Sequence, residues 1–228
     1  MKITTKFMFL LMLSAMVSLV SCDNQPTGEQ VEVSDVDVNA EPGTEEPAPD
    51  AMAMVDYPVN VAASMVNWEG AKITGKHSGT LNIKEGALQV ADNVIKGGSF
   101  VLDMGSIAVT DLEAGQGKEK LEGHLKTGDF FEVETFPTAK FDITEVATAE
   151  DREDATHYIT GNLTIRDVTK QVKLPASVTM TEGSISAETP AFVIDRQLWG
   201  IDYEGKKDDL IKDEIGLVIK LQADKAAM

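Results

Sequence analysis

The residue with the most distinctive chemistry is Cys22, the only cysteine in a chain of 228 residues. A lone thiol cannot form an internal disulfide, and a free thiol in an oxidising compartment is open to unwanted reactions. The residues before it suggest another role. Lys2 and Lys6 form a short basic start, and residues 7–20 are mainly apolar. Because this run is shorter than the roughly 20 residues that span a bilayer, the pattern is typical of a signal peptide.

The apolar run ends in Leu19-Val20-Ser21-Cys22, which resembles the lipobox of bacterial lipoproteins. In that motif the thiol receives diacylglycerol, and the chain is cut directly before the cysteine. We therefore expect residues 1–21 to be a lipoprotein signal peptide and Cys22 to be a lipid anchor, since two or more acyl chains hold a protein stably at a membrane. An ordinary secretory signal with a chance cysteine is the alternative. The expected location is the periplasm or the cell exterior, at a membrane.

Motifs of metal or catalytic chemistry are missing from the sequence. His77, His124 and His157 have no metal-ligand neighbour at i+2 or i+4, so no zinc site is expected. The acidic residues within 208–214 lack the alternating oxygen ligands and central glycine of a calcium loop. There is also no nucleophile elbow, phosphate-binding loop or dinucleotide fingerprint. We expect a binding protein, not an enzyme, without metal or cofactor.

Residues 22–56 differ in composition from the rest of the chain. Residues 23–56 hold ten carboxylates and four prolines, with no Lys, Arg or aromatic residue. Low hydrophobicity and charge of one sign do not offset the entropy that ordering costs. The segment is therefore expected to be a disordered acidic tether that holds the domain away from the bilayer. An acidic arm that binds a partner is the alternative.

The charge of the remaining chain excludes one class of partner. The formal net charge is −18; the two lysines of the signal and the ten tether carboxylates leave −10 on residues 57–228. An acidic domain should repel nucleic acid and anionic lipid surfaces. We expect no nucleic-acid binding, and contact with the membrane only through Cys22. The oligomeric state stays open, with a homodimer as one option.

Residues 57–228 are long enough for one domain with a sizeable core. Period-two alternation of apolar and polar residues predicts half-buried strands. The clearest are residues 80–84, 99–104, 140–144, 162–166, 171–174, 191–195 and 217–221. Residues 117–128 carry Leu121 and Leu125 four apart, which predicts a short amphipathic helix, and residues 208–215 could form a second helical turn. These elements predict an all-β antiparallel barrel or sandwich with one short helix.

Several sequence blocks in order resemble the YceI-like domain family. The most specific is LEGHLKTGDFF at residues 121–131, followed by FPTAKF at 136–141. Further blocks are residues 66–70, 75–79, 98–107, 161–170, 195–201 and 213–215. The resemblance covers residues 57–223 and implies a lipocalin-like antiparallel β-barrel of about eight strands. The chain departs from the family pattern after Tyr203, where Glu204 to Asp209 replace a Gly-Ser-Phe-Phe-like stretch.

The resemblance also implies a function, because characterised relatives hold a polyisoprenoid or a fatty-acid amide inside the barrel. We therefore expect non-catalytic binding of a long apolar lipid. Candidate lining residues at inward strand positions are Phe100, Leu102, Phe141, Ile143, Leu163, Ile165, Phe192 and Ile194. Candidates for the end or flank of the site are Trp68, Phe130, Phe131, Phe136 and Trp199. Core packing competes with each assignment. The alternative function is a structural or protein-interaction lipoprotein whose own side chains fill the barrel.

Overall fold

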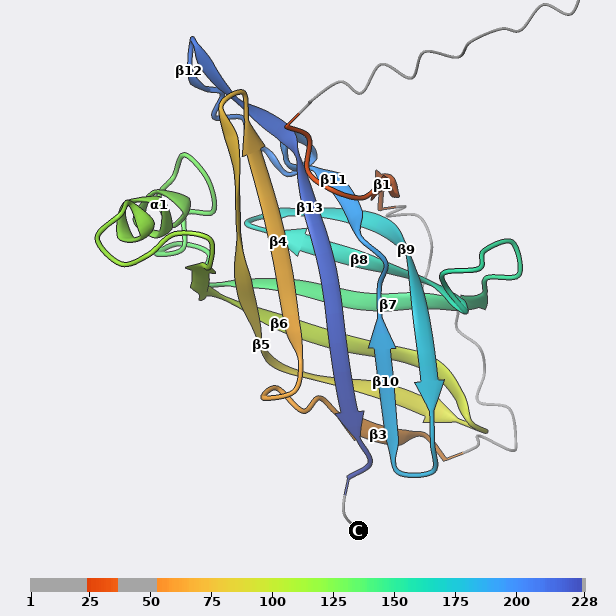
Figure 1. The fold of residues 1–228 in the computed structure, drawn as a ribbon. Coiled ribbons are helices and arrows are strands. Elements are labelled where there is room, and N and C mark those ends of the chain that lie inside the picture. Colours follow the sequence, from red (N-terminus) through yellow and green to blue (C-terminus); the bar gives the residue numbers. More distant parts are fainter. Residues whose placement is uncertain (1–23, 37–52, 227–228) are drawn as a thin grey trace, which may run out of the picture.

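The computed structural model describes residues 24–36 and 53–226, so Cys22 and the signal peptide lie outside the described residues. The main feature is a closed barrel in which eight strands pair antiparallel with their neighbours and the last pairs with the first (Figure 1). The expected all-β barrel is confirmed. Its strands are β4 (Met65–Lys72), β5 (Gly75–Ala91), β6 (Val94–Val109), β7 (Thr138–Thr148), β8 (His157–Ile165), β9 (Val168–Met180), β10 (Ser184–Glu188) and β13 (Asp209–Asp224).

Shorter elements complete the fold. Strand β3 pairs with β5, strand β11 pairs with β13, and the helix α1 lies outside the barrel (Figure 1). The helix is tied to the wall because the carboxylate of Glu122 accepts a hydrogen bond from the backbone N–H of Val109 at 2.8 Å. These elements are β1 (Glu29–Gln30), β2 (Glu32–Asp35), β3 (Val55–Pro58), α1 (Lys118–Leu125), β11 (Phe192–Asp195), the 3₁₀ helix η1 (Arg196–Trp199) and β12 (Gly205–Lys206).

The expected strand cores coincide with observed strands to within one residue, but most observed strands are longer. Strand β5 has 17 residues and β6 has 16. Their pairing shifts register between Thr80 and Asn82 and again between Ile83 and Glu85. Such bulges bend and twist a strand, which lets two long strands follow a curved wall. They also interrupt the alternation, so that only short stretches are visible in the sequence.

The expected second helical turn over residues 208–215 is wrong. Apart from Asp208, which lies in a turn, this stretch belongs to β13 and pairs with β4. The register shifts between Ile211 and Ile215, so the stretch does not alternate regularly in sequence. Pairing with β4 stabilises this irregular strand, and the sequence alone did not reveal the partner.

The N-terminal segment, residues 24–36, fills a gap in the barrel wall. Strands β10 and β11 both pair with β13. Among the described strands, β10 also pairs with β9, whereas β11 does not. Between β11 and the first half of β9 lie β1, which runs parallel to β11, and β2, which runs antiparallel to β9 (Figure 1). Val31, between β1 and β2, is 8% exposed and belongs to the hydrophobic core.

This arrangement differs from the disordered tether expected over residues 22–56. Residues 24–36 are ordered because backbone pairing and burial of Val31 are joined by charge complementarity. In the register of β2 with β9, Glu32 faces Lys173 and Asp35 faces Lys170, and such opposite charges stabilise a strand pair. Strand β3 extends the ordered part at the other end of the expected tether. Residues 37–52 lie outside the described part.

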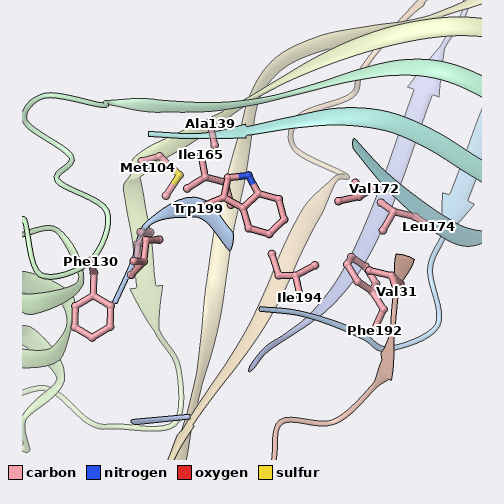
Figure 2. Packing of buried hydrophobic residues seen from close by; sticks show 12 residues of the cluster. Val31, Met104, Phe130, Ala139, Ile165, Val172, Leu174, Phe192, Ile194 and Trp199 are labelled. Atoms are coloured by element: carbon pink, nitrogen blue, oxygen red, sulfur yellow. The ribbon is translucent and has the colours of Figure 1, made fainter. Parts of the chain in front are cut away.

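The hydrophobic core has two clusters, one of which surrounds Trp199. Trp199 is 1% exposed, and its indole Nε1–H donates a hydrogen bond to the carbonyl of Leu163 at 3.0 Å. Figure 2 shows Trp199 between Ile165 of β8 and Ile194 of β11, with Val31 beside the neighbouring part of the wall. The 3₁₀ helix η1 therefore closes one side of the barrel interior.

Candidate ligand-binding cavity

The barrel encloses a cavity of about 260 Å³. The volume is close to the lower end of the roughly 300–1,000 Å³ typical of small-molecule sites. The cavity exists because successive side chains of a strand point to opposite faces, so every second side chain of the wall points inward. Nearly all of its lining residues are aliphatic, aromatic or methionine residues contributed by strands around the whole barrel.

Eleven of the thirteen candidates from the sequence line this cavity. Phe100 and Phe141 come from adjacent strands in direct register, and their ring centroids lie 6.5 Å apart in a stacked arrangement. The structure thus brings residues from most of the wall to one space, and their role in ligand binding stays a prediction. The eleven are Trp68, Phe100, Leu102, Phe130, Phe131, Phe141, Ile143, Leu163, Ile165, Phe192 and Ile194.

Phe136 and Trp199 are the two candidates that do not line the cavity. The Phe136 ring lies under the Arg166 guanidinium, 5.7 Å from its carbon, in a cation–π contact. Trp199 is packed in the core with its one polar atom bonded to Leu163. Both positions are consistent with core or surface packing. Packing was the alternative to ligand binding for every candidate.

Sequence reasoning missed many lining residues. Leu81 and Ile83 belong to an expected strand and have the correct alternation, so the signal was present. Ile215 and Leu88 lie in strands whose bulges hide the alternation. No signal marked the charged side chains, because their position depends on the pairing of β11 with β13.

The charged lining residues gather at one end of the cavity. They are Arg196, Lys212 and Glu214, from η1 and β13. Arg196 is 2% exposed, and its guanidinium donates to the carbonyls of Lys212 and Ile201 and to the carboxylate of Asp213. A buried cation needs such partners, and here they fix η1 against β13. The polar atoms of these residues contribute almost nothing to the cavity surface, which is apolar throughout.

An aromatic cluster lies beside the cavity where α1 meets the barrel. The His124 ring makes edge contacts with Phe130 at 5.0 Å and Tyr203 at 5.2 Å between centroids. His124 Nε2 is 2.9 Å from the carboxylate of Asp129. His124 therefore has partners on both sides, and it holds the loop after α1 near Tyr203.

The titratable groups with shifted pKa values lie in contacts outside the cavity lining. A hydrogen bond from Lys170 lowers the pKa of Asp35, and one from Lys72 lowers the pKa of Asp209. Burial raises the pKa of Glu69, but hydrogen bonds from Thr27 and Lys76 outweigh it, so the net shift is downward. These shifts describe structural ion pairs. They do not tune a group for proton transfer in the cavity.

Residues 24–36 and 53–226 contain no group of three or more His, Cys, Asp or Glu residues arranged to hold a metal ion. The same residues contain no helix that is long and apolar enough to cross a membrane.

The fold and cavity together define a small antiparallel barrel with an apolar interior. A model of the YceI-like domain family matches residues 57–223, and the chain belongs to this family. UPF0312 proteins of Pseudomonas aeruginosa and Pseudomonas paraeruginosa are each 47% identical to it over 55 residues. That match covers 24% of this chain and 27% of each relative, so the chain spans about a quarter of the length of these curated relatives.

Two solved structures share the fold. BcnA of Burkholderia cenocepacia is 19% identical with a TM-score of 0.53, and the match covers 72% of this chain and 99% of BcnA. A polyisoprenoid binding domain from Saccharophagus degradans, implicated in plant cell wall breakdown, is 12% identical with a TM-score of 0.55. That match covers 75% of this chain and 99% of the domain. At these identities the similarity establishes the fold.

Proposed function

We propose that this protein binds a long apolar lipid inside its barrel and performs no catalysis. The observation that carries the proposal is the cavity inside the barrel, whose surface is almost entirely apolar. The family and the polyisoprenoid binding domain of similar fold support this choice of ligand. A polyisoprenoid or fatty-acid-like chain would place its tail among the apolar strands.

The energetics of such binding depend on apolar burial. Each buried CH₂ group contributes about 0.8 kcal/mol, and micromolar affinity requires about 8 kcal/mol after the entropic costs of association. A few isoprene units are therefore sufficient without precise polar contacts. The alternative, a structural lipoprotein whose side chains fill the barrel, does not account for the empty volume.

We further propose that the barrel is exported and held at a membrane by acyl chains on Cys22. The support is the lipobox-like Leu19-Val20-Ser21-Cys22 after a basic start and an apolar run. In cells, Cys22→Ser should abolish acylation and shift the protein to the soluble envelope fraction. A variant that still fractionates with membranes, without an acylated N-terminus by mass spectrometry, would contradict the anchor.

Binding can be tested with a substitution that fills the cavity. Leu163 lines the cavity from β8, whereas Thr160 does not line it and lies on the outward side of the same strand. Leu163→Trp should therefore reduce binding of a prenyl compound at least about tenfold, the effect of losing about 1.4 kcal/mol. Thr160→Trp adds the same ring outside and should bind as the parent does.

The readout is native mass spectrometry of the purified protein, followed by titration with a fluorescent prenyl compound. Circular dichroism checks that both variants keep the fold. The proposal is overturned if the parent protein carries no chain-like lipid and does not bind the probe. Equal affinity of the parent and Leu163→Trp for the prenyl probe would show that this cavity is not the binding site.

A further inference from the structure

The N-terminal segment determines which end of the barrel lies nearest to the proposed anchor. The side-chain amide of Asn24 donates a hydrogen bond to the carbonyl of Ile73 at 3.0 Å, in the turn between β4 and β5. The backbone N–H of Thr27 donates to Glu69 at 2.6 Å. Asn24 is two residues from Cys22, which is at most about 7 Å of extended chain. An acyl group on Cys22 would therefore be tethered within a few residues of this turn.

Two turns form the surface at this end of the barrel. The β4–β5 turn contacts the end of β13, because the backbone N–H of Ile73 donates to the carbonyl of Leu210 at 3.0 Å. Ile73 is 53% exposed and Leu210 is 41% exposed. Figure 1 shows β12 and the ends of β4 and β5 at the same end of the barrel, far from the C-terminus. Two exposed aliphatic side chains thus lie next to the proposed anchor.

The charges around this pair balance, although the domain as a whole is acidic. Lys206 and Lys207 are exposed in the β12–β13 hairpin, and the exposed carboxylates of Glu204 and Asp208 offset them. Asp209 is compensated by Lys72 and by the hydroxyl of Thr74. Local charge therefore does not oppose contact with lipid, and the position of the anchor carries the argument for this end of the barrel.

Exposed aliphatic residues alone would not identify this end of the barrel as the one that contacts lipid. Val94, at the far end of the β5–β6 hairpin, is 47% exposed, and Val61 is 45% exposed. Residues 24–36 distinguish the two ends of the barrel. They pair with β11 and β9 and so hold the start of the described chain at the β4–β5 turn. The acidic residues 37–52 connect β2 to β3, and they do not separate the anchor from the barrel.

The part of the cavity lined by Arg196 and Lys212 lies at the same end of the barrel. Ile211 pairs with Lys72 in the register of β13 with β4. The next residue, Lys212, lines the cavity, and its backbone carbonyl accepts a hydrogen bond from the Arg196 guanidinium. The surface beside the proposed anchor and this part of the cavity are therefore formed by the same stretch of β13.

We propose that the end of the barrel formed by the β4–β5 and β12–β13 turns docks on the lipid bilayer, with Ile73 and Leu210 at the level of the headgroups. This inference rests on the proposed acylation of Cys22. It gives the barrel a fixed orientation, in which the part of the cavity lined by Arg196 and Lys212 faces the membrane that supplies the lipid ligand.

The test uses the full mature chain with a nitroxide spin label. Because acylation blocks Cys22, Ile73→Cys introduces the only free thiol. Val94→Cys is the matched control, since it is an aliphatic residue of similar exposure at the other end of β5. Each labelled protein is bound to vesicles of phosphatidylethanolamine and phosphatidylglycerol, and depth is measured from collisions with oxygen and with a water-soluble nickel chelate.

A label at position 73 should lie about 5–10 Å below the surface, the depth of interfacial side chains, and a label at position 94 should be in water. Leu210→Cys is a second reporter and should agree with position 73. Vesicle-bound protein with both ends in water, or with position 94 immersed, overturns docking and leaves the anchor intact. Protein that does not float with vesicles and shows an unmodified Cys22 by mass spectrometry overturns the anchor and docking together. Lipid binding is measured separately through Leu163→Trp.

Discussion

Trp199 illustrates how one side chain can serve the fold instead of the ligand. As a large aromatic residue near a family block it was a candidate for the site, yet it contacts the core, not the cavity. Its indole N–H satisfies the carbonyl of Leu163, and Leu163 itself lines the cavity. Trp199 therefore positions the wall beside the proposed ligand.

Replacing Trp199 should cost stability. Trp199→Phe leaves the Leu163 carbonyl without its partner, which we expect to lower the free energy of unfolding by about 1–3 kcal/mol. Trp199→Ala should lower it by about 3–5 kcal/mol, because a cavity is added. The neighbouring Leu198 is 39% exposed, so Leu198→Ala should change it by less than about 0.5 kcal/mol. Urea denaturation of the three variants measures the difference, and equal effects would contradict the structural role.

At the scale of elements, Gly28 controls whether β1 can pair with β11. Gly28 has φ +144°, and a Cβ atom there would lie 2.6 Å from the backbone carbon of Phe192. Backbone atoms cannot move aside as a flexible side chain can. We expect Gly28→Ala to detach residues 24–36 while the barrel stays closed, and limited proteolysis should then cut this segment first.

The matched control for Gly28 is Gly115→Ala. Gly115 also has a positive φ, +79°, but nothing lies within 4 Å of its Cβ position. Gly115→Ala therefore adds backbone strain without a collision, and it should leave the N-terminal segment protected from cleavage. Cleavage within residues 24–36 in both variants, or in neither, would count against a steric role for Gly28.

The pairing of the same segment should depend on pH. The pKa values of Glu69 and Asp35, which contact Thr27 and Lys170, are lowered in the folded protein. A lowered pKa means that their contribution is complete above the ordinary values of 4.5 and 3.8 and is lost as the pH falls through the lower folded-state values. The protection factors of amide hydrogen exchange in residues 24–36, which correct for the intrinsic rate at each pH, should therefore fall below about pH 4.

Glu69→Gln provides the control for this pH dependence. The amide keeps a hydrogen-bond acceptor for Thr27 but does not titrate, so the variant should show a weaker pH dependence. Protection factors that are equal at neutral and acidic pH would show that these carboxylates do not hold the segment.

The elements also show how far the sequence alone could lead. Regular alternation located strand cores such as residues 140–144 and 171–174, and the eight candidates that it placed at inward strand positions all line the cavity. Bulged strands such as β13 were misread or shortened, since a bulge reverses the alternation. The order of residues 24–36 could not be predicted, because composition does not reveal that Lys170 and Lys173 face Asp35 and Glu32.

At the scale of the whole molecule, an apolar ligand should stabilise the barrel. Binding to the native state alone raises the free energy of unfolding by about 2.7 kcal/mol when free ligand is a hundredfold above the dissociation constant. Delipidated protein should therefore melt several degrees lower than protein reloaded with a prenyl compound, as measured by calorimetry. Leu163→Trp should show no such difference, and a ligand-independent melting temperature in the parent would contradict binding.

The wall is closed by pairs that are far apart in the chain: Glu29 lies opposite Phe192, and Met65 lies opposite Lys220. Ribosomes add about 5–20 residues per second, so the 163 positions from Glu29 to Phe192 take on the order of 10–30 s to synthesise. During that time β1 has no partner, and β2 has none until residues 170–173 of β9 are made; unpaired strands invite aggregation. Glu32, Asp35 and the acidic residues that follow act against such contacts through repulsion. The negative charge on and beside β2 thus protects a strand whose partner follows much later in the chain.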